Sequence, residues 1–118
     1  LGGTMYQKFG VTGDPGPIYR PANDKGRGGV TGNAAEDYFF KVPTLRNIEL
    51  TAPYFHTGSE PDLKKTIDVM AKVQMGQTLS ATEIDQIAAF LGSLTGDQPK
   101  VTVPNLPASD AKYPLPDK

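Results

Sequence analysis

The segment from Phe39 to His56 constrains the fold of this chain most strongly. It holds four aromatic residues, two prolines, two cations and the only histidine of the 118-residue sequence. Its apolar residues follow neither a 3.6-residue helical repeat nor a 2-residue strand repeat. Because Pro43 and Pro53 fix φ and restrict the residues before them, we expect an extended run, one helical turn at 44–47 and a second extended run. A rigid, irregular segment of this kind suits a flat, apolar-faced ligand that carries negative charge.

Composition limits the size of the hydrophobic core. Hydrophobic residues make up 37% of the chain, which has 13 glycines and 11 prolines. We therefore expect a thin core that a bound macrocycle would complete and stabilise. A net charge of −1 without a basic run argues against nucleic acid or an anionic membrane surface as the main partner. No run of about 18 apolar residues is present, so no membrane span is expected.

Residues 11–32 are predicted to form a long loop, because they are rich in glycine and contain three prolines. Turns are expected at 13–16 and 28–29. A loop longer than about 12–15 residues in a compact domain is either a solvated surface or functional. If it is functional, Tyr19 and Arg20 are its expected contacts to the ligand or to another domain.

Helical spacing predicts a first helix over about 60–73. Ser59 is placed to cap this helix, and Pro61 falls in its first turn, where a missing N–H costs little. Its apolar face is formed by Leu63, Ile67 and Met70.

A second helix is predicted from Ser80 to about Thr95. Ser80 and Glu83 form a capping box, and Gly96 stops the helix. Its apolar face is formed by Ile84, Ile87, Ala88, Leu91 and Leu94. Residues 98–118 contain five prolines and no apolar period, which predicts an extended tail.

Several short motifs in order give the chain a family resemblance. They are Lys41–Asn47, Thr51–Ser59, Ile67–Met70, and then 79–83 and 91–96. Together they resemble the C-terminal haem domain of bacterial di-haem cytochrome c peroxidases and of the related methylamine-utilisation di-haem enzymes. The resemblance implies an all-α, cytochrome-c-like haem domain over residues 1–97, with long irregular loops and an extended tail at 98–118.

The haem attachment motif of that family, Cys-x-x-Cys-His, has no counterpart here, because the chain has no cysteine. In the family the motif lies just upstream of a segment like Gly2-Gly3. We therefore expect Leu1 to be an internal residue of a longer protein that attaches its haem c outside this segment. The lack of cysteine consequently carries no information on the redox compartment.

Met70 is the candidate iron ligand. A helical methionine in an arbitrary protein is more often a core residue. The resemblance instead makes Met70 the distal axial ligand of the electron-transferring haem c, where a thioether favours ferrous iron and raises its potential. Met75 is the competing candidate, which we assign to packing. A tyrosine takes this place in the methylamine-utilisation enzymes, so Met70 favours the peroxidase branch.

His56 is a candidate iron ligand because imidazole commonly binds iron. The resemblance places it beside the haem without making it an axial ligand, so we expect it to tune the haem or to relay protons and electrons. Tyr54 and Phe55 are expected in the same pocket. Arg46 and Lys41 are candidates to neutralise haem propionates, since arginine offers a planar fork to a carboxylate. The alternative for both cations is a solvated surface position.

The resemblance also implies a calcium ion, held in part by the main-chain carbonyls of Thr51 and Pro53. Calcium accepts carbonyl oxygens readily, and proline still offers one. In the family this ion lies at the interface with the N-terminal haem domain. Nothing in Thr-Ala-Pro alone specifies a metal.

The function implied by the resemblance is that of the electron-entry half of a periplasmic di-haem peroxidase, expected to be a homodimer. A small cytochrome c or cupredoxin would donate electrons to the domain that contains Met70. Hydrogen peroxide would be reduced to water at a second haem c in the N-terminal domain, so no catalytic residue is expected in this segment. Two alternatives stay open: a di-haem enzyme that oxidises a protein substrate, and a mono-haem electron carrier.

Overall fold

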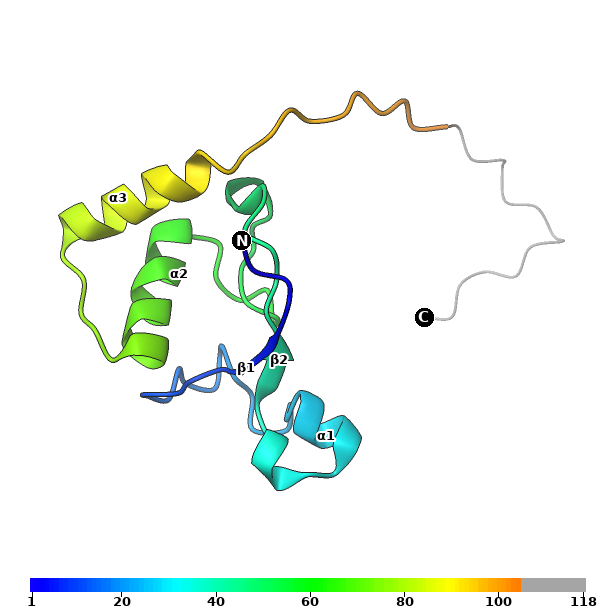
Figure 1. Cartoon of the computed structure of the whole chain (residues 1–118), viewed down its shortest axis with the longest axis vertical. Coiled ribbons are helices and arrows are strands. Elements are labelled where there is room, and N and C mark those ends of the chain that lie inside the picture. The colour runs from blue at the N-terminus through cyan, green and yellow to red at the C-terminus, as the bar shows by residue number, and fades with distance from the viewer. Residues whose placement is uncertain (105–118) are drawn as a thin grey trace, which may run out of the picture.

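The computed structural model describes residues 1–104. Its helices pack beside the irregular segment of residues 39–56, which we call the wall (Figure 1). Helices α2 (Leu63–Met70) and α3 (Ala81–Gly92) lie on one side of two short strands, β1 (Tyr6–Lys8) and β2 (Phe39–Lys41). The five-residue helix α1 (Arg27–Thr31) lies near β2, away from the other two helices.

The all-α prediction is wrong, because β1 and β2 pair as an antiparallel two-stranded sheet. The register sets Gln7 opposite Phe40. An isolated bridge between Gly2 and Thr44 continues this contact along the wall. The wall was expected to be extended, and extended backbone must satisfy its N–H and C=O groups. The N-terminal segment supplies those partners for Phe39–Lys41, whose aromatic residues favour a strand.

The predicted helical turn at 44–47 is displaced along the chain. A 3₁₀ helix, η2 (Ile48–Leu50), follows Asn47, which adopts a left-handed conformation with φ 60°. The Asn47 side chain accepts a hydrogen bond from Gly96 N at 2.8 Å, and Asn47 N donates to Leu94 O at 3.2 Å. These contacts attach the wall to the end of α3.

The long loop at 11–32 is less irregular than predicted. The expected turn at 28–29 is part of α1, which is followed by a second 3₁₀ helix, η1 (Ala34–Glu36). Gly28 is buried in α1, and a Cβ there would overlap the backbone of Asp37. Only glycine therefore allows α1 and the end of η1 to approach this closely.

The first predicted helix begins three residues later than expected. Asp62, not Ser59, is the cap of α2, and its carboxylate accepts from Lys65 N at 3.0 Å. The Ser59 hydroxyl instead lies 2.7 Å from that of Thr57. Glu60 cannot start the helix because its carbonyl accepts from Tyr54 N in an isolated bridge. A π-helical turn, η3 (Ala71–Met75), continues α2 beyond Met70.

The second predicted helix has the expected start. Ser80 and Glu83 form both hydrogen bonds of the capping box, and α3 follows directly. It ends at Gly92 rather than near Thr95, and two hydrogen-bonded turns follow it. Lys64 and Asp85 join α2 to α3 through an ion pair of 2.7 Å.

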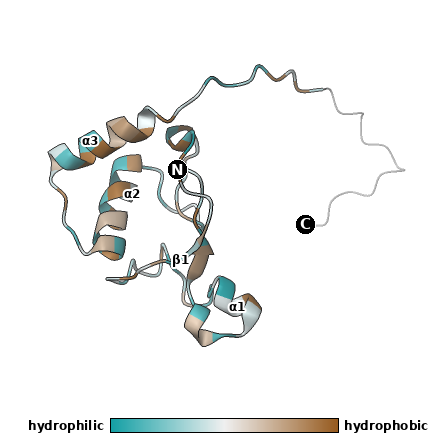
Figure 2. Ribbon diagram, in the orientation of Figure 1, coloured by the Kyte–Doolittle hydropathy of each residue, from teal (hydrophilic) through white to brown (hydrophobic). Residues whose placement is uncertain are grey.

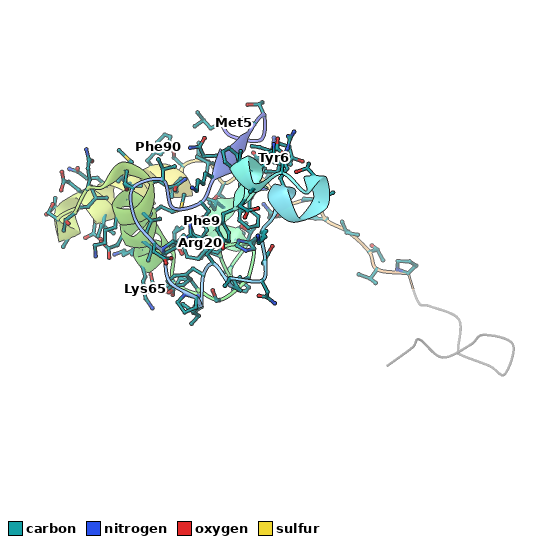
Figure 3. The ribbon with its side chains drawn as sticks, turned by 90° about the horizontal axis from the view of Figure 1, so that it is seen from below. Met5, Tyr6, Phe9, Arg20, Lys65 and Phe90 are labelled. Atoms are coloured by element: carbon teal, nitrogen blue, oxygen red, sulfur yellow. The ribbon has the colours of Figure 1, made fainter. Side chains whose placement is uncertain are left out.

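The core of the described part of the chain is thin, as the composition predicts. Phe9, Tyr19 and Val73 form its centre, and Phe40, Phe55 and Val69 pack against them. No large side chain among residues 1–104 is fully buried. In Figure 3, Phe9 lies beside Arg20, whose guanidinium donates to Phe9 O at 2.7 Å.

Residues 98–104 contain no helix or strand. The remainder of the predicted extended tail, 105–118, lies outside the described residues. Within residues 1–104, no helix is long and apolar enough to cross a membrane.

Candidate functional site

A large apolar cavity separates the wall from the helices. Its volume is about 840 Å³, within the range of roughly 300–1,000 Å³ that is usual for ligand pockets. Figure 2 shows apolar residues along both α2 and α3, the two helices that line it. The lining residues of α2, η3 and α3 are Leu63, Thr66, Ile67, Met70, Ala71, Gln74, Met75, Ile87 and Leu91. Among the described residues, this cavity thus lies between the wall and the helices, where the hydrophobic core of a small domain is usually found.

Met70 and Met75 both line this cavity. Met70 is the last residue of α2 and is 39% exposed, whereas Met75 ends the π-helical turn and is 64% exposed. Met70 is therefore the better enclosed thioether. Both methionines therefore lie at the same cavity. The choice of Met70 as the iron ligand stays a prediction.

His56 lines the cavity from the opposite side. Its ring stacks on Phe40 with centroids 4.0 Å apart, and its Nε2 lies 3.0 Å from a carboxylate oxygen of Asp24. The side chain is only 25% exposed. Because Asp24 occupies Nε2, one of the two possible ligating nitrogens of His56 is already engaged.

Tyr54 and Phe55 also line the cavity. Burial raises the pKa of Tyr54, and the carboxylates of Glu49 and Asp62 add to the effect. Phe55 adopts φ 64°, an unusual conformation for an aromatic residue. That conformation lets its ring pack on Tyr19, with centroids 4.8 Å apart.

Comparison with known proteins decides the family. The chain is 43% identical over 116 residues to cytochrome c551 peroxidase of Pseudomonas aeruginosa, a match that covers 98% of this chain and 34% of that protein. Identity to cytochrome c551 peroxidase of Nitrosomonas europaea is 46% over 114 residues, covering 97% of this chain and 33% of that protein. The chain belongs to the bacterial cytochrome c peroxidase family. It spans about a third of the length of these curated relatives.

More distant relatives include the methylamine-utilisation enzymes, which the sequence motifs also resemble. Methylamine utilization protein MauG of Methylophilus methylotrophus is 30% identical over 99 residues, covering 74% of this chain and 30% of that protein. No protein-family model matches the chain.

The residues present fit the haem that cytochrome c peroxidases contain. The cavity is wide, its walls are apolar, and thioether and imidazole groups lie on its lining, which are ligand types that haem iron takes. The chain supplies no cysteine for covalent attachment. It can therefore contribute the walls of the site, but not the thioether links, and the axial ligand stays a prediction.

The two cations predicted to meet propionates are not brought together. Lys41 is the one lining residue with a fixed charge among residues 1–104. Arg46 lies instead in a separate hollow of about 300 Å³, formed with Leu1 and residues 93–96. The displaced helical turn explains this, because Arg46 precedes η2 and faces the end of α3.

Thr51 and Pro53, the predicted calcium-binding positions, both line the cavity. Residues 1–104 contain no group of three or more acidic, histidine or cysteine side chains that could hold a metal. Calcium binding would therefore depend on main-chain carbonyls and on groups outside this part of the chain.

Glu60 is a residue of this region that the sequence did not single out. It is 3% exposed, and its carboxylate accepts from Tyr19 Oη at 2.7 Å and lies 2.8 Å from Lys65 Nζ. Hydrogen bonds from Lys65 and Tyr19 lower the pKa of Glu60 below its ordinary value of 4.5. The cluster joins the 11–32 loop to the start of α2. No local pattern signals it, because Glu60 precedes a proline and resembles an exposed first-turn residue.

We predict that Glu60 makes the domain sensitive to acid. Because its pKa is lower in the folded state, ionised Glu60 contributes stability above its unfolded pKa, and that contribution is lost as the pH falls through the folded value. Glu60→Gln should therefore flatten the fall in melting temperature of the full-length protein below about pH 4.5. Asp97→Asn, which removes an exposed carboxylate, is the control. Parallel melting curves against pH for wild type and Glu60→Gln would contradict the assignment.

Proposed function

We propose that the chain is the electron-accepting haem domain of a peroxidase that reduces hydrogen peroxide to water. The supporting observation is the apolar cavity lined by Met70, Met75 and His56, in a chain of the cytochrome c peroxidase family. The enzyme would draw electrons from a small cytochrome c or cupredoxin in the periplasm. Peroxide would be reduced in another domain, which holds a second haem c.

A bound haem c would supply reversible one-electron transfer at this site. The Met70 sulfur is the proposed axial donor, and a thioether donor favours the ferrous state. The aromatic and aliphatic lining excludes water, which reduces the dielectric around the site. Lys41 is placed to balance negative charge at the edge of the cavity.

His56 is proposed to act beside the haem rather than on the iron. The Asp24 carboxylate lies 3.0 Å from Nε2 and would hold the orientation of the imidazole. Stacking on Phe40 holds the plane of the ring. His56 would thus present a polar group of fixed orientation to an otherwise apolar site.

The full-length protein tests this function. We expect its intact mass to show two covalently bound haems, and a reduced small cytochrome c to be oxidised only when hydrogen peroxide is added. One haem per chain would indicate a mono-haem electron carrier instead. Two haems without peroxide-dependent oxidation would contradict the peroxidase.

We predict that His56→Ala leaves the methionine–iron charge-transfer band of the ferric full-length protein in place. The imidazole does not bind the iron in this proposal, so its removal leaves both axial ligands unchanged. Near-infrared absorption measures the band, with Asp24→Asn as a matched variant that keeps a side-chain oxygen near Gly26 N and removes the charge of the partner of His56. Loss of the band in His56→Ala would show that the histidine is a ligand.

We also propose calcium binding by the main-chain carbonyls of Thr51 and Pro53, together with groups of the N-terminal domain, in a homodimer. Calcium removal is expected to weaken dimerisation or activity, because the ion would join two domains. Sedimentation and turnover are measured with calcium and with a chelator. If neither changes, these carbonyls do not bind a functional ion.

A further inference from the structure

The side chain of Gln74 joins two distant parts of the chain. Its Oε1 accepts from Gly10 N at 2.7 Å and from Val11 N at 3.2 Å, and its Nε2 donates to Lys8 O at 2.9 Å. An amide offers one acceptor oxygen and one donor group, so both ends of Gln74 are used. These bonds span 63 to 66 positions of sequence. Gln74 therefore holds the end of the α2–η3 helix against the last residue of β1 and the chain that follows it.

Thr12 adds to this attachment from the same segment. Its N–H donates to Val73 O at 2.9 Å, and its hydroxyl donates to Lys72 O at 2.9 Å. Carbonyls near the end of a helix need partners outside it. Residues 8–12 thus hold the π-helical turn η3 through both its carbonyls and the Gln74 side chain.

This turn begins directly after Met70. In a continuous α-helix the residue four positions on, Gln74, would lie on the same face as Met70. A π turn closes its hydrogen bonds over five residues, and single π turns occur mostly at functional sites. The extra residue shifts Met75 toward the face of Met70, and both methionines line the cavity. The geometry of η3 therefore decides how the two thioethers face the ligand.

We propose that Gln74 is a positioning residue that keeps Met70, rather than Met75, directed at the haem iron. This inference rests on the proposed role of Met70 as the axial ligand. Gln74 acts through the backbone, because it fixes η3 to the 8–12 segment and so fixes the end of α2 that carries Met70. Without this attachment, η3 can rewind, and the Met70 sulfur is held less firmly.

The test is competition between Met70 and added imidazole in the ferric full-length protein. Loss of the methionine–iron charge-transfer band reports displacement of Met70. Gln74→Leu retains side-chain bulk but makes none of the three bonds, and we expect imidazole to displace methionine at about tenfold lower concentration. Gln74→Glu keeps the acceptor oxygens and loses the donor, so a smaller shift, about threefold, is expected. Gln86→Leu, an exposed glutamine of α3, is the matched control and should shift nothing.

An unchanged imidazole concentration in a folded Gln74→Leu protein would overturn the proposal. If Gln74→Leu does not fold, Gln74→Glu and Thr12→Val decide the question, and unchanged displacement in both overturns it. Met70→Leu tests the role of Met70 as ligand separately from the positioning role of Gln74. If that variant keeps the band, Met70 is not the ligand and the proposed function fails at this point. If it loses the band while the Gln74 variants behave as wild type, only the positioning role of Gln74 fails.

Discussion

Met70→His in the full-length protein is expected to leave the iron low-spin while lowering its reduction potential by on the order of 0.1 V or more. Imidazole stabilises ferric iron better than a thioether does, so the ferrous state becomes harder to reach. For a one-electron couple, 59 mV corresponds to a tenfold change in equilibrium. The variant should therefore accept electrons poorly from a donor of high potential.

A spectroscopic redox titration of Met70→His measures this shift. Met75→Leu is the matched control, because it replaces one apolar side chain on the same cavity by another of similar volume. We expect its potential to equal that of the wild type. A normal potential in Met70→His together with a shifted one in Met75→Leu would assign the ligand to Met75.

Phe9→Ala is expected to destabilise the domain by about 3–5 kcal/mol, the usual cost of truncating a buried aromatic residue. Phe9 is 7% exposed and lies between the small core and the cavity. Its ring packs on Phe55 at 5.4 Å between centroids. Truncation therefore joins the cavity to a new void in an already thin core.

Denaturant unfolding of the haem-loaded full-length protein, followed by absorption of the methionine-ligated haem, checks this value. Phe9→Leu, which keeps most of the apolar volume, is the control and should cost clearly less. Ile18→Ala, at an exposed position, should cost almost nothing. A loss below about 1 kcal/mol in Phe9→Ala would show that Phe9 is not part of the core.

Local signals in the sequence predicted the parts of the fold that depend on neighbouring residues. The start of α3 is an example, because Ser80 and Glu83 satisfy each other's backbone groups within one turn. The start of α2 depends on more distant contacts. Ser59 is a good capping residue, but Tyr54 N binds Glu60 O and holds the chain extended past it. Asp62 then becomes the first residue able to cap the helix.

The sheet could not be predicted for the same reason. The apolar pattern of Phe39–Lys41 shows an irregular segment, while its pairing partner Tyr6–Lys8 lies more than thirty residues away. Backbone hydrogen bonds between such segments leave no local periodicity. The all-α expectation followed from the family resemblance and overlooked this contact.

In the candidate site too, features that depend on neighbouring residues were predicted, and features that depend on distant contacts were not. Aromatic residues, prolines and His56 in one segment indicated a shaped wall, and that segment does line the cavity. Arg46 lies in a separate hollow, since the turn after it falls at Ile48–Leu50 rather than at 44–47, and its contact with a propionate stays a prediction. Gln74 and Asp24 were missed, since each acts through contacts with a segment far away in the sequence.

Proton NMR of the reduced full-length protein tests the role of Met70 most directly. The methyl group of an iron-bound methionine lies over the haem plane, where the ring current shifts its signal upfield out of the protein envelope. We expect one such signal, absent in Met70→Leu and retained in Met75→Leu. A signal that persists in Met70→Leu, or that disappears in Met75→Leu, would contradict ligation of the iron by Met70.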